Sequence, residues 1–362
     1  MKYLMLMFFL PLLFVKTVWA ECAASDPQQV SMPLLSQNLT IGEDLPDGAV
    51  LFHQSYKQTQ AHEINCSSAS DSATGFKLST DYTSAGLGLS SWTSTPSGSG
   101  KVYETGIQGI GFVVIGSDAR KPAPYESNTL CKNCTTSQLD NSLFDADVFL
   151  IKTGPVLPGS LQGGSLPCLR THLNDGVSGG ELFDVGEMCF SGSINIVSKT
   201  CTTPDITVDM GSYSLNTLKV KGKTTGWKDA SIHLVNCPVF YGRGEESSST
   251  RWSQNGSSTV ADNIENVISV KITPGTDVLD DEKGIFSLTK ETDSAQGIGV
   301  QLAYGTADMA DIFALSKSKD FPRPLNSSGE VTIPLVARYI QTEDKVSSGQ
   351  ADSIATYTIS YR

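Results

Sequence analysis

Nucleophilic catalysis is the first chemistry to consider, because Ser178 lies in the sequence Gly-Val-Ser-Gly-Gly at residues 176–180. This pattern fits G-x-S-x-G, in which the serine stands on a sharp turn between a strand and a helix. Residues 171–180 are polar and turn-rich, so neither flanking element is predicted. A chymotrypsin-like site would have an aspartate immediately before the serine, and Val177 is there instead. We therefore predict a glycine-rich loop and no enzyme, with an exported serine hydrolase as the less favoured alternative.

The eight cysteines could support redox chemistry, a metal site or structural disulfides. Cys131 and Cys134 form a CxxC pair, but polar loop residues flank it in place of the strand and helix of a redox motif. No second CxxC and no histidine pair lie at zinc-ligand spacing, so we expect no metal and no cofactor. An even number in an exported chain favours disulfides. Proximity along the chain and domain organisation favour the pairs Cys22–Cys66, Cys131–Cys134, Cys168–Cys189 and Cys201–Cys237.

Carbohydrate recognition is a third possibility in the first half of the chain. It usually combines an aromatic ring that stacks on sugar C–H groups with carboxylates and amides that bond hydroxyls. Trp92 is the strongest candidate, because it is an aromatic residue in a predicted polar loop at residues 84–100. The alternative role for Trp92 is structural, as an anchor beneath that loop. The other candidates are Asp81, Tyr82, Tyr125, Asn174 and Asp175.

The composition limits the class of protein. The chain has 362 residues, a formal net charge of -12 and only 18% charged residues. Nucleic acid is not an expected partner, because phosphate binding needs clustered Lys and Arg. Residues 1–20 join Lys2 to an apolar run and end in Val-Trp-Ala, which predicts a secretory signal peptide cleaved after Ala20. The apolar run is shorter than the roughly 20 residues that a membrane span needs.

Short runs of alternating apolar residues recur along the chain, separated by Gly, Pro, Ser, Asn and Asp. Residues 298–304 and 331–339 each place apolar side chains on one face of a strand. Strands of this kind bury that face against a second sheet. We predict an all-β protein of two tandem β-sandwiches, with domains at residues 21–198 and 199–362. Each domain then closes its own disulfides.

The last residues predict a strand that reaches the end of the sequence. Ala355, Tyr357, Ile359 and Tyr361 alternate with polar residues. An Ig-like sandwich usually continues with one more strand beside this one. An apolar strand with an open edge is an aggregation hazard. One solution is a strand added by another chain, so we expect the second sandwich to be incomplete.

Residues 199–362 resemble the pilin domain of chaperone–usher fimbriae. The segments that carry the resemblance are 201–211, 227–237, 297–302 and 331–339, followed by Gly349 and the penultimate Tyr361. The resemblance implies an Ig-like fold that lacks its last strand. In that family a periplasmic chaperone first lends a strand, and the N-terminal extension of the next subunit then replaces it. Ala355, Tyr357, Ile359 and Tyr361 match the strand that contacts both.

The first domain resembles the receptor-binding domain of fimbrial tip adhesins, closest to the type 3 fimbrial adhesin group. Residues 41–51, 106–111 and 152–154 carry this resemblance. A whole domain, and no donor extension, precedes the first pilin cysteine, which implies a place at the fimbrium tip. The resemblance implies export through the periplasm and the outer-membrane usher, and attachment to a host glycan or extracellular-matrix receptor. A minor structural or adaptor subunit without its own ligand is the alternative.

Overall fold

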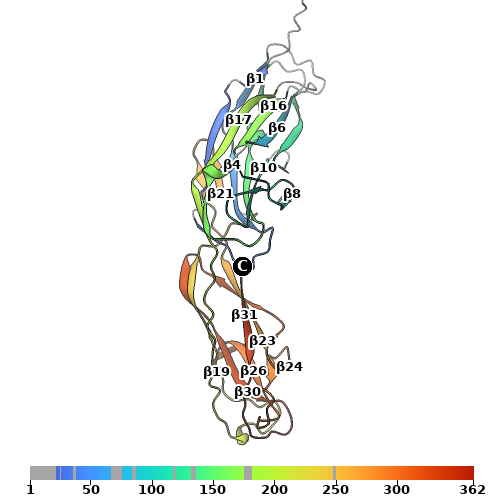
Figure 1. The fold of residues 1–362 in the computed structure, drawn as a ribbon, viewed down its shortest axis with the longest axis vertical. Helices are drawn as coiled ribbons and strands as arrows, with labels where there is room; N and C mark the ends of the chain where they lie inside the picture. The colour runs from blue at the N-terminus through green and yellow to red at the C-terminus, as the bar shows by residue number, and fades with distance from the viewer. Residues whose placement is uncertain are drawn as a thin grey trace, which may run out of the picture.

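The computed structural model describes residues 22–24, 26–35, 38–66, 76–83, 87–116, 120–131, 136–174, 182–247 and 250–362. Regular structure in these residues is almost entirely β-strand, which confirms the all-β prediction. The exceptions are short 3-10 turns at Asn141–Phe144, Gly163–Ser165 and Leu215–Thr217. The molecule is elongated, with two β-bodies placed end to end (Figure 1). The predicted signal peptide and Ser178 lie outside the described residues.

The upper body is built on two sheets that pack against each other. The larger one has seven strands: β11 (Lys121–Pro122), β10 (Ile110–Gly116), β14 (Ala146–Lys152), β4 (Val50–Lys57), β21 (Thr250–Ser253) and β22 (Ser258–Thr259), with β9 (Tyr103–Glu104) on β10. The opposing sheet has the order β12 (Tyr125–Cys131), β6 (Phe76–Tyr82), β16 (Leu169–Asn174), β17 (Leu182–Ser191) and β2 (Gln28–Pro33).

Smaller strand groups extend this body. They are β1 (Cys22–Ala24), β5 (His62–Cys66) and β13 (Thr136–Leu139); β15 (Gly159–Gln162), β18 (Ser193–Val197) and β3 (Asn38–Thr40); and the pair β7 (Ser94–Thr95) and β8 (Gly98–Ser99).

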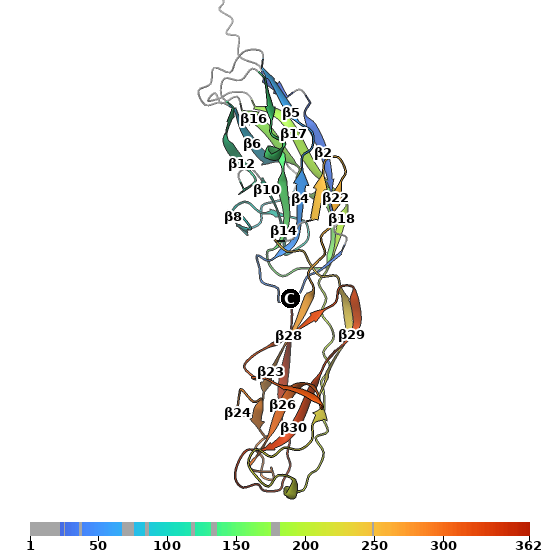
Figure 2. The ribbon, with the colours of Figure 1, turned by 180° about the vertical axis from the view of Figure 1, so that it is seen from behind.

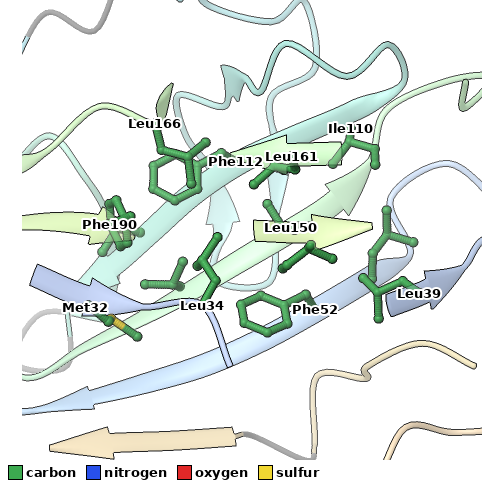
Figure 3. Packing of buried hydrophobic residues seen from close by; sticks show 14 of the residues in the cluster. Met32, Leu34, Leu39, Phe52, Ile110, Phe112, Leu150, Leu161, Leu166 and Phe190 are labelled. Atoms are coloured by element: carbon green, nitrogen blue, oxygen red, sulfur yellow. The ribbon is translucent and has the colours of Figure 1, made fainter. Parts of the chain in front are cut away.

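The upper core lies between the two main sheets. Figure 3 shows Phe52, Phe112 and Leu150 of the larger sheet facing Met32 and Phe190 of the other. Strand β10 reads as a continuous apolar run because both of its faces are buried. Its alternate residues Val113 and Ile115 join a second cluster on the opposite face of the larger sheet.

The lower body is a second set of strands around its own core. One sheet has the order β19 (Lys228–Asp229), β30 (Leu335–Gln341), β26 (Ile298–Thr306), β25 (Ile285–Ser287) and β24 (Val278–Asp280), with β27 (Met309–Ile312) on β26. Strand β20 (Ile232–Phe240) pairs with β29 (Ser327–Ile333), and β23 (Asn266–Pro274) lies between β28 (Lys319–Arg323) and β31 (Ala355–Tyr361). The alternating residues of 298–304 and 331–339 form much of this core, although Pro334 divides the second run between β29 and β30.

One hairpin of the second half of the chain belongs to the upper body. Strand β21 pairs in parallel with β4, and Trp252 stacks on Tyr56 with ring centroids 5.9 Å apart. Figure 2 shows β22 within the upper body, level with β4. The domain boundary predicted at residue 199 therefore misplaces residues 250–259. The hairpin covers the edge of β4, which would otherwise present unpaired backbone groups.

The two described disulfides follow the predicted pairs. Cys168 bonds to Cys189, and Cys201 bonds to Cys237. Cys22 lies opposite Cys66 in the antiparallel register of β1 and β5, which places the two backbones as the predicted Cys22–Cys66 bond requires. The predicted Cys131–Cys134 pair lies outside the described residues, since Cys134 falls in a gap. Within the described ranges, no helix is long and apolar enough to cross a membrane.

Candidate functional site

A long groove runs along the lower body beside β31. Its volume is about 1030 Å³, and residues 205–215 and 347–355 form its two walls, with Tyr357 of β31 beside the second. The floor is apolar and comes from several strands of the lower core: Ile232, Ile272, Phe286, Val300, Leu302 and Leu335. A groove with this floor can bury apolar side chains that alternate along an extended segment.

One edge of β31 faces away from its partner strand. Val267 and Arg362 exchange two backbone hydrogen bonds of 2.7 and 2.9 Å, which fixes the alternation along the β23–β31 ladder. The N–H and C=O groups of Ala355, Tyr357 and Ile359 consequently point to the opposite edge. Across the described ranges, no strand pairs with that edge. The edge offers ladder hydrogen bonds to an additional strand.

The first body closes the upper end of this edge. The Asp44 amide donates to the Tyr361 carbonyl over 3.0 Å, and the Tyr361 amide donates to Asp44 Oδ2 over 2.8 Å. The chain can approach this closely because residue 42 is glycine: a Cβ there would lie 2.1 Å from the Tyr361 oxygen. The backbone left for pairing is therefore that of Ala355, Tyr357 and Ile359.

The aromatic residues of β31 fix the strand to the start of the second half. The Tyr361 hydroxyl accepts a hydrogen bond from the Cys201 amide over 3.2 Å, and the Tyr357 hydroxyl donates to the Pro204 carbonyl. Burial raises the pKa of both tyrosines, with Asp205 contributing at Tyr357 and Asp44 at Tyr361. Tyr357, Ile359 and Tyr361 pack on the lower core, and Ala355 lies at the groove wall. The structure thus brings the four predicted groove residues together on one strand.

The opposite wall differs from the expected first strand of the domain. Residues 201–211 resemble a strand in sequence, but only Thr202 bridges to a neighbour, Val235 of β20. Residues 203–211 have no ladder partner, because the groove separates them from β31. Val208 and Met210 still pack against the core. This segment is therefore a wall held by side chains.

Two of the predicted sugar-binding residues, Trp92 and Tyr82, make contacts within the upper body. Trp92 donates from Nε1 to the Ser94 carbonyl over 2.8 Å, and its ring lies above Gly48, where a Cβ would be 3.1 Å away. These contacts match the structural alternative for Trp92. Tyr82 is also structural: its hydroxyl accepts from the Val114 amide over 2.8 Å, and its ring contacts Tyr103 at 4.5 Å between centroids. Burial raises the pKa of Tyr82.

Asp81, Tyr125 and Asn174 belong to the five-stranded sheet of the upper body. Asp81 Oδ2 lies 2.9 Å from Nε2 of His172, a histidine that sequence reasoning did not select. Tyr125 pairs with Thr80 of β6 in register, and its hydroxyl lies over Gly116. Asn174 ends β16, and Asp175 lies outside the described residues. Asp81 and Tyr125 are thus on neighbouring strands, and their role in binding stays a prediction.

Residues 188–362 match the family model described as fimbrial protein. This part of the chain is therefore similar to the fimbrial protein family. The match spans the lower body and the groove, together with the hairpin of β21 and β22. Among curated proteins, none matches this sequence.

Solved structures similar to this chain include three from fimbrial systems. The CupB6 tip adhesin from Pseudomonas aeruginosa has 15% identity and a TM-score of 0.35, with 94% of each chain covered. The P pilus rod subunit PapA has 15% identity and a TM-score of 0.30, covering 45% of this chain and all of that one (100%). The CsuC–CsuE chaperone–tip adhesion subunit complex of Acinetobacter baumannii has 9% identity and a TM-score of 0.23, with 94% and 100% covered. At these scores, the likeness to the fimbrial protein family depends on the sequence match of residues 188–362.

Proposed function

We propose that this chain is a two-domain tip adhesin of a chaperone–usher fimbria. The lower domain would accept a strand from another chain, and the upper domain would bind a host glycan or an extracellular-matrix protein. The observation that carries the proposal is the open backbone edge of Ala355, Tyr357 and Ile359 beside an apolar groove. The match to the fimbrial protein family supports it.

The groove has the two features that strand addition uses. Main-chain hydrogen bonds to the β31 edge supply affinity, and the apolar floor receives alternate side chains. The occupant we propose is a strand of a periplasmic chaperone first, and the N-terminal extension of the next subunit afterwards. We also propose that the protein passes through the periplasm and the outer-membrane usher and is placed at the fimbrium tip on the cell surface. The proposed function is binding and includes no catalysis.

Purification from the periplasm tests the strand proposal. We expect the chain, co-expressed with a fimbrial chaperone and its usher system, to co-purify with the chaperone in equal amounts. Cross-linking should join residues 355–359 to one chaperone strand. A stable monomer in the periplasm without any chaperone or donor segment would contradict the proposal.

Receptor binding needs a separate test, because a structural or adaptor subunit would have the same groove. Strand β21 completes the β4 edge of the upper body, so the full chain is the right material. We expect chaperone-bound full chain to bind at least one ligand on a glycan and matrix-protein array. A blank array would favour the adaptor alternative. Ester hydrolysis lost in Ser178→Ala would instead support the serine hydrolase.

A further inference from the structure

The wall opposite β31 has a charged outer side. Ile206 lines the groove, while Val208 and Met210 pack against the lower core. Because side chains alternate along an extended chain, Asp205 and Asp209 lie on the outer side of this wall. Both are exposed, and the Asp209 carboxylate accepts a hydrogen bond from the Gly211 amide over 2.9 Å.

Carboxylates of the groove contribute to raised pKa values of its tyrosines. Burial first, and then Asp205, raises the pKa of Tyr357. Burial, followed by Asp352 and Asp209 among the charged groups, raises the pKa of Tyr339. Asp205, Asp209 and Asp352 are the charged residues of the groove lining, which contains no Lys or Arg within the described parts of the chain. A cation, Lys228, lies at the Gly211 end of this wall, where a Cβ on residue 211 would be 3.7 Å from its Nζ. The groove therefore has a negative potential.

The facing wall is neutral at its outer side. Thr356 and Thr358 of β31 are exposed and alternate with the core-facing Tyr357 and Ile359. A strand lying between the walls would place its outer side chains between these threonines and the two aspartates. Opposite charges directly across two neighbouring strands stabilise their pairing.

We infer that the groove selects a strand with Lys or Arg at two outer positions four residues apart, opposite Asp205 and Asp209. Four residues of extended chain span about 13 Å, and the two aspartates have this same spacing along their own segment. The inner positions of that strand are apolar, to match the floor. This inference rests on the proposed function, because it requires that a strand enters the groove.

Three synthetic nine-residue peptides test the inference on the full chain, which is purified with its chaperone and released from it shortly before the measurement. All have valine at the four even positions and threonine elsewhere, apart from two charged residues. The first has lysine at positions three and seven, the second has glutamate at the same positions, and the third has lysine at positions three and five. Binding is measured by calorimetry at low and high salt, and in the variant Asp205→Asn with Asp209→Asn.

We expect the first peptide to bind roughly tenfold more tightly than the second at low salt, and more tightly than the third. The difference should shrink at high salt, where exposed charges are screened. It should largely disappear in the double variant, whose asparagine at 209 retains a side-chain oxygen for the Gly211 amide. Equal binding of all three peptides would overturn the inference alone. Absence of binding by every peptide would overturn the proposed function as well.

Discussion

Asp44 and Tyr361 exchange two hydrogen bonds, although 317 positions separate them in the sequence. The Asp44 amide meets the Tyr361 carbonyl, and the Asp44 carboxylate meets the Tyr361 amide. A turn of the upper body thereby occupies the end of the β31 edge. The same strand, β31, forms one wall of the groove. The contact therefore joins the upper body, which is proposed to bind a receptor, to the strand with which an added segment would pair.

Asp44→Ala should weaken this contact. The substitution removes the acceptor of the Tyr361 amide and leaves the fold otherwise intact. We expect a loss of about 1 kcal/mol in the free energy of unfolding, as is usual for one hydrogen bond. Urea denaturation measures it, with Glu43→Ala as the control at the exposed neighbouring position. An unchanged midpoint for Asp44→Ala would show that the contact is not stabilising.

Gly42→Ala should have a larger effect. A Cβ at residue 42 would lie 2.1 Å from the Tyr361 carbonyl oxygen and 2.7 Å from the Arg362 nitrogen, so backbone must move. We expect a loss of about 2 kcal/mol or more. Gly88→Ala is the matched control, because its Cβ would meet nothing within 4 Å. Equal thermal midpoints for the two variants would contradict this account of the junction.

Ile359→Asp should prevent strand capture. It places a charge on the core side of β31, where no cation lines the described groove. We expect loss of chaperone co-purification and proteolysis in the periplasm, and a further loss when Tyr361→Asp is added. Thr358→Asp is the control, since this side chain is exposed on the outer side. Wild-type periplasmic levels of Ile359→Asp would argue against the groove as the capture site.

Trp252→Ala should destabilise the upper body, although residue 252 comes from the second half of the chain. Its ring packs on Tyr56 and on the upper core. We expect a loss of about 2 kcal/mol and faster amide exchange along β4, because a large, partly buried aromatic is removed. Arg251→Ala changes an exposed neighbour in the same strand and serves as the control. Faster exchange in the lower body alone would contradict the assignment of this hairpin.

Asp147 should make the free energy of unfolding depend on pH in the acid range. Burial opposes ionisation, but hydrogen bonds from His53 and Ser55 hold the pKa of this carboxyl below its usual value. Since the folded pKa is the lower one, the stabilisation is present above the ordinary value of about 3.9 and declines as pH falls through the folded value. Unfolding of wild type and Asp147→Asn should therefore differ at neutral pH and converge in acid. A difference that grows on acidification would refute this sign.

Much of the lower body could be predicted from sequence, because its strands carry a regular signal. Large apolar side chains alternate along residues 298–304, and β26 places Val300, Leu302 and Tyr304 in the core. Ala355 to Tyr361 alternate in the same way and form β31. Cys201 and Cys237 are near enough in sequence to favour each other, and they do bond.

The contacts between the upper and lower bodies could not be predicted in this way, because no regular alternation of residues marks them. Strand β21 is short and mostly polar, so its sequence does not predict a strand. Pairing with β4 gives these residues their extended conformation. Asp44 lies in a turn, and nothing local indicates that it bonds to Tyr361. Tyr82, in contrast, had a usable signal. It shares parity with Leu78 and Thr80, which are buried in β6, and its partly buried ring packs against the upper core.

Amide hydrogen exchange at Ala355, Tyr357 and Ile359 tests the central claim most directly. The full chain, released from its chaperone shortly before the measurement, is compared alone and with the nine-residue peptide that has lysine at positions three and seven. Alone, these three amides should exchange quickly while that of Ser360, which faces β23, stays protected; with peptide, all should be slow. Strong protection of all three amides in the peptide-free monomer, or no change on adding peptide, would contradict the account.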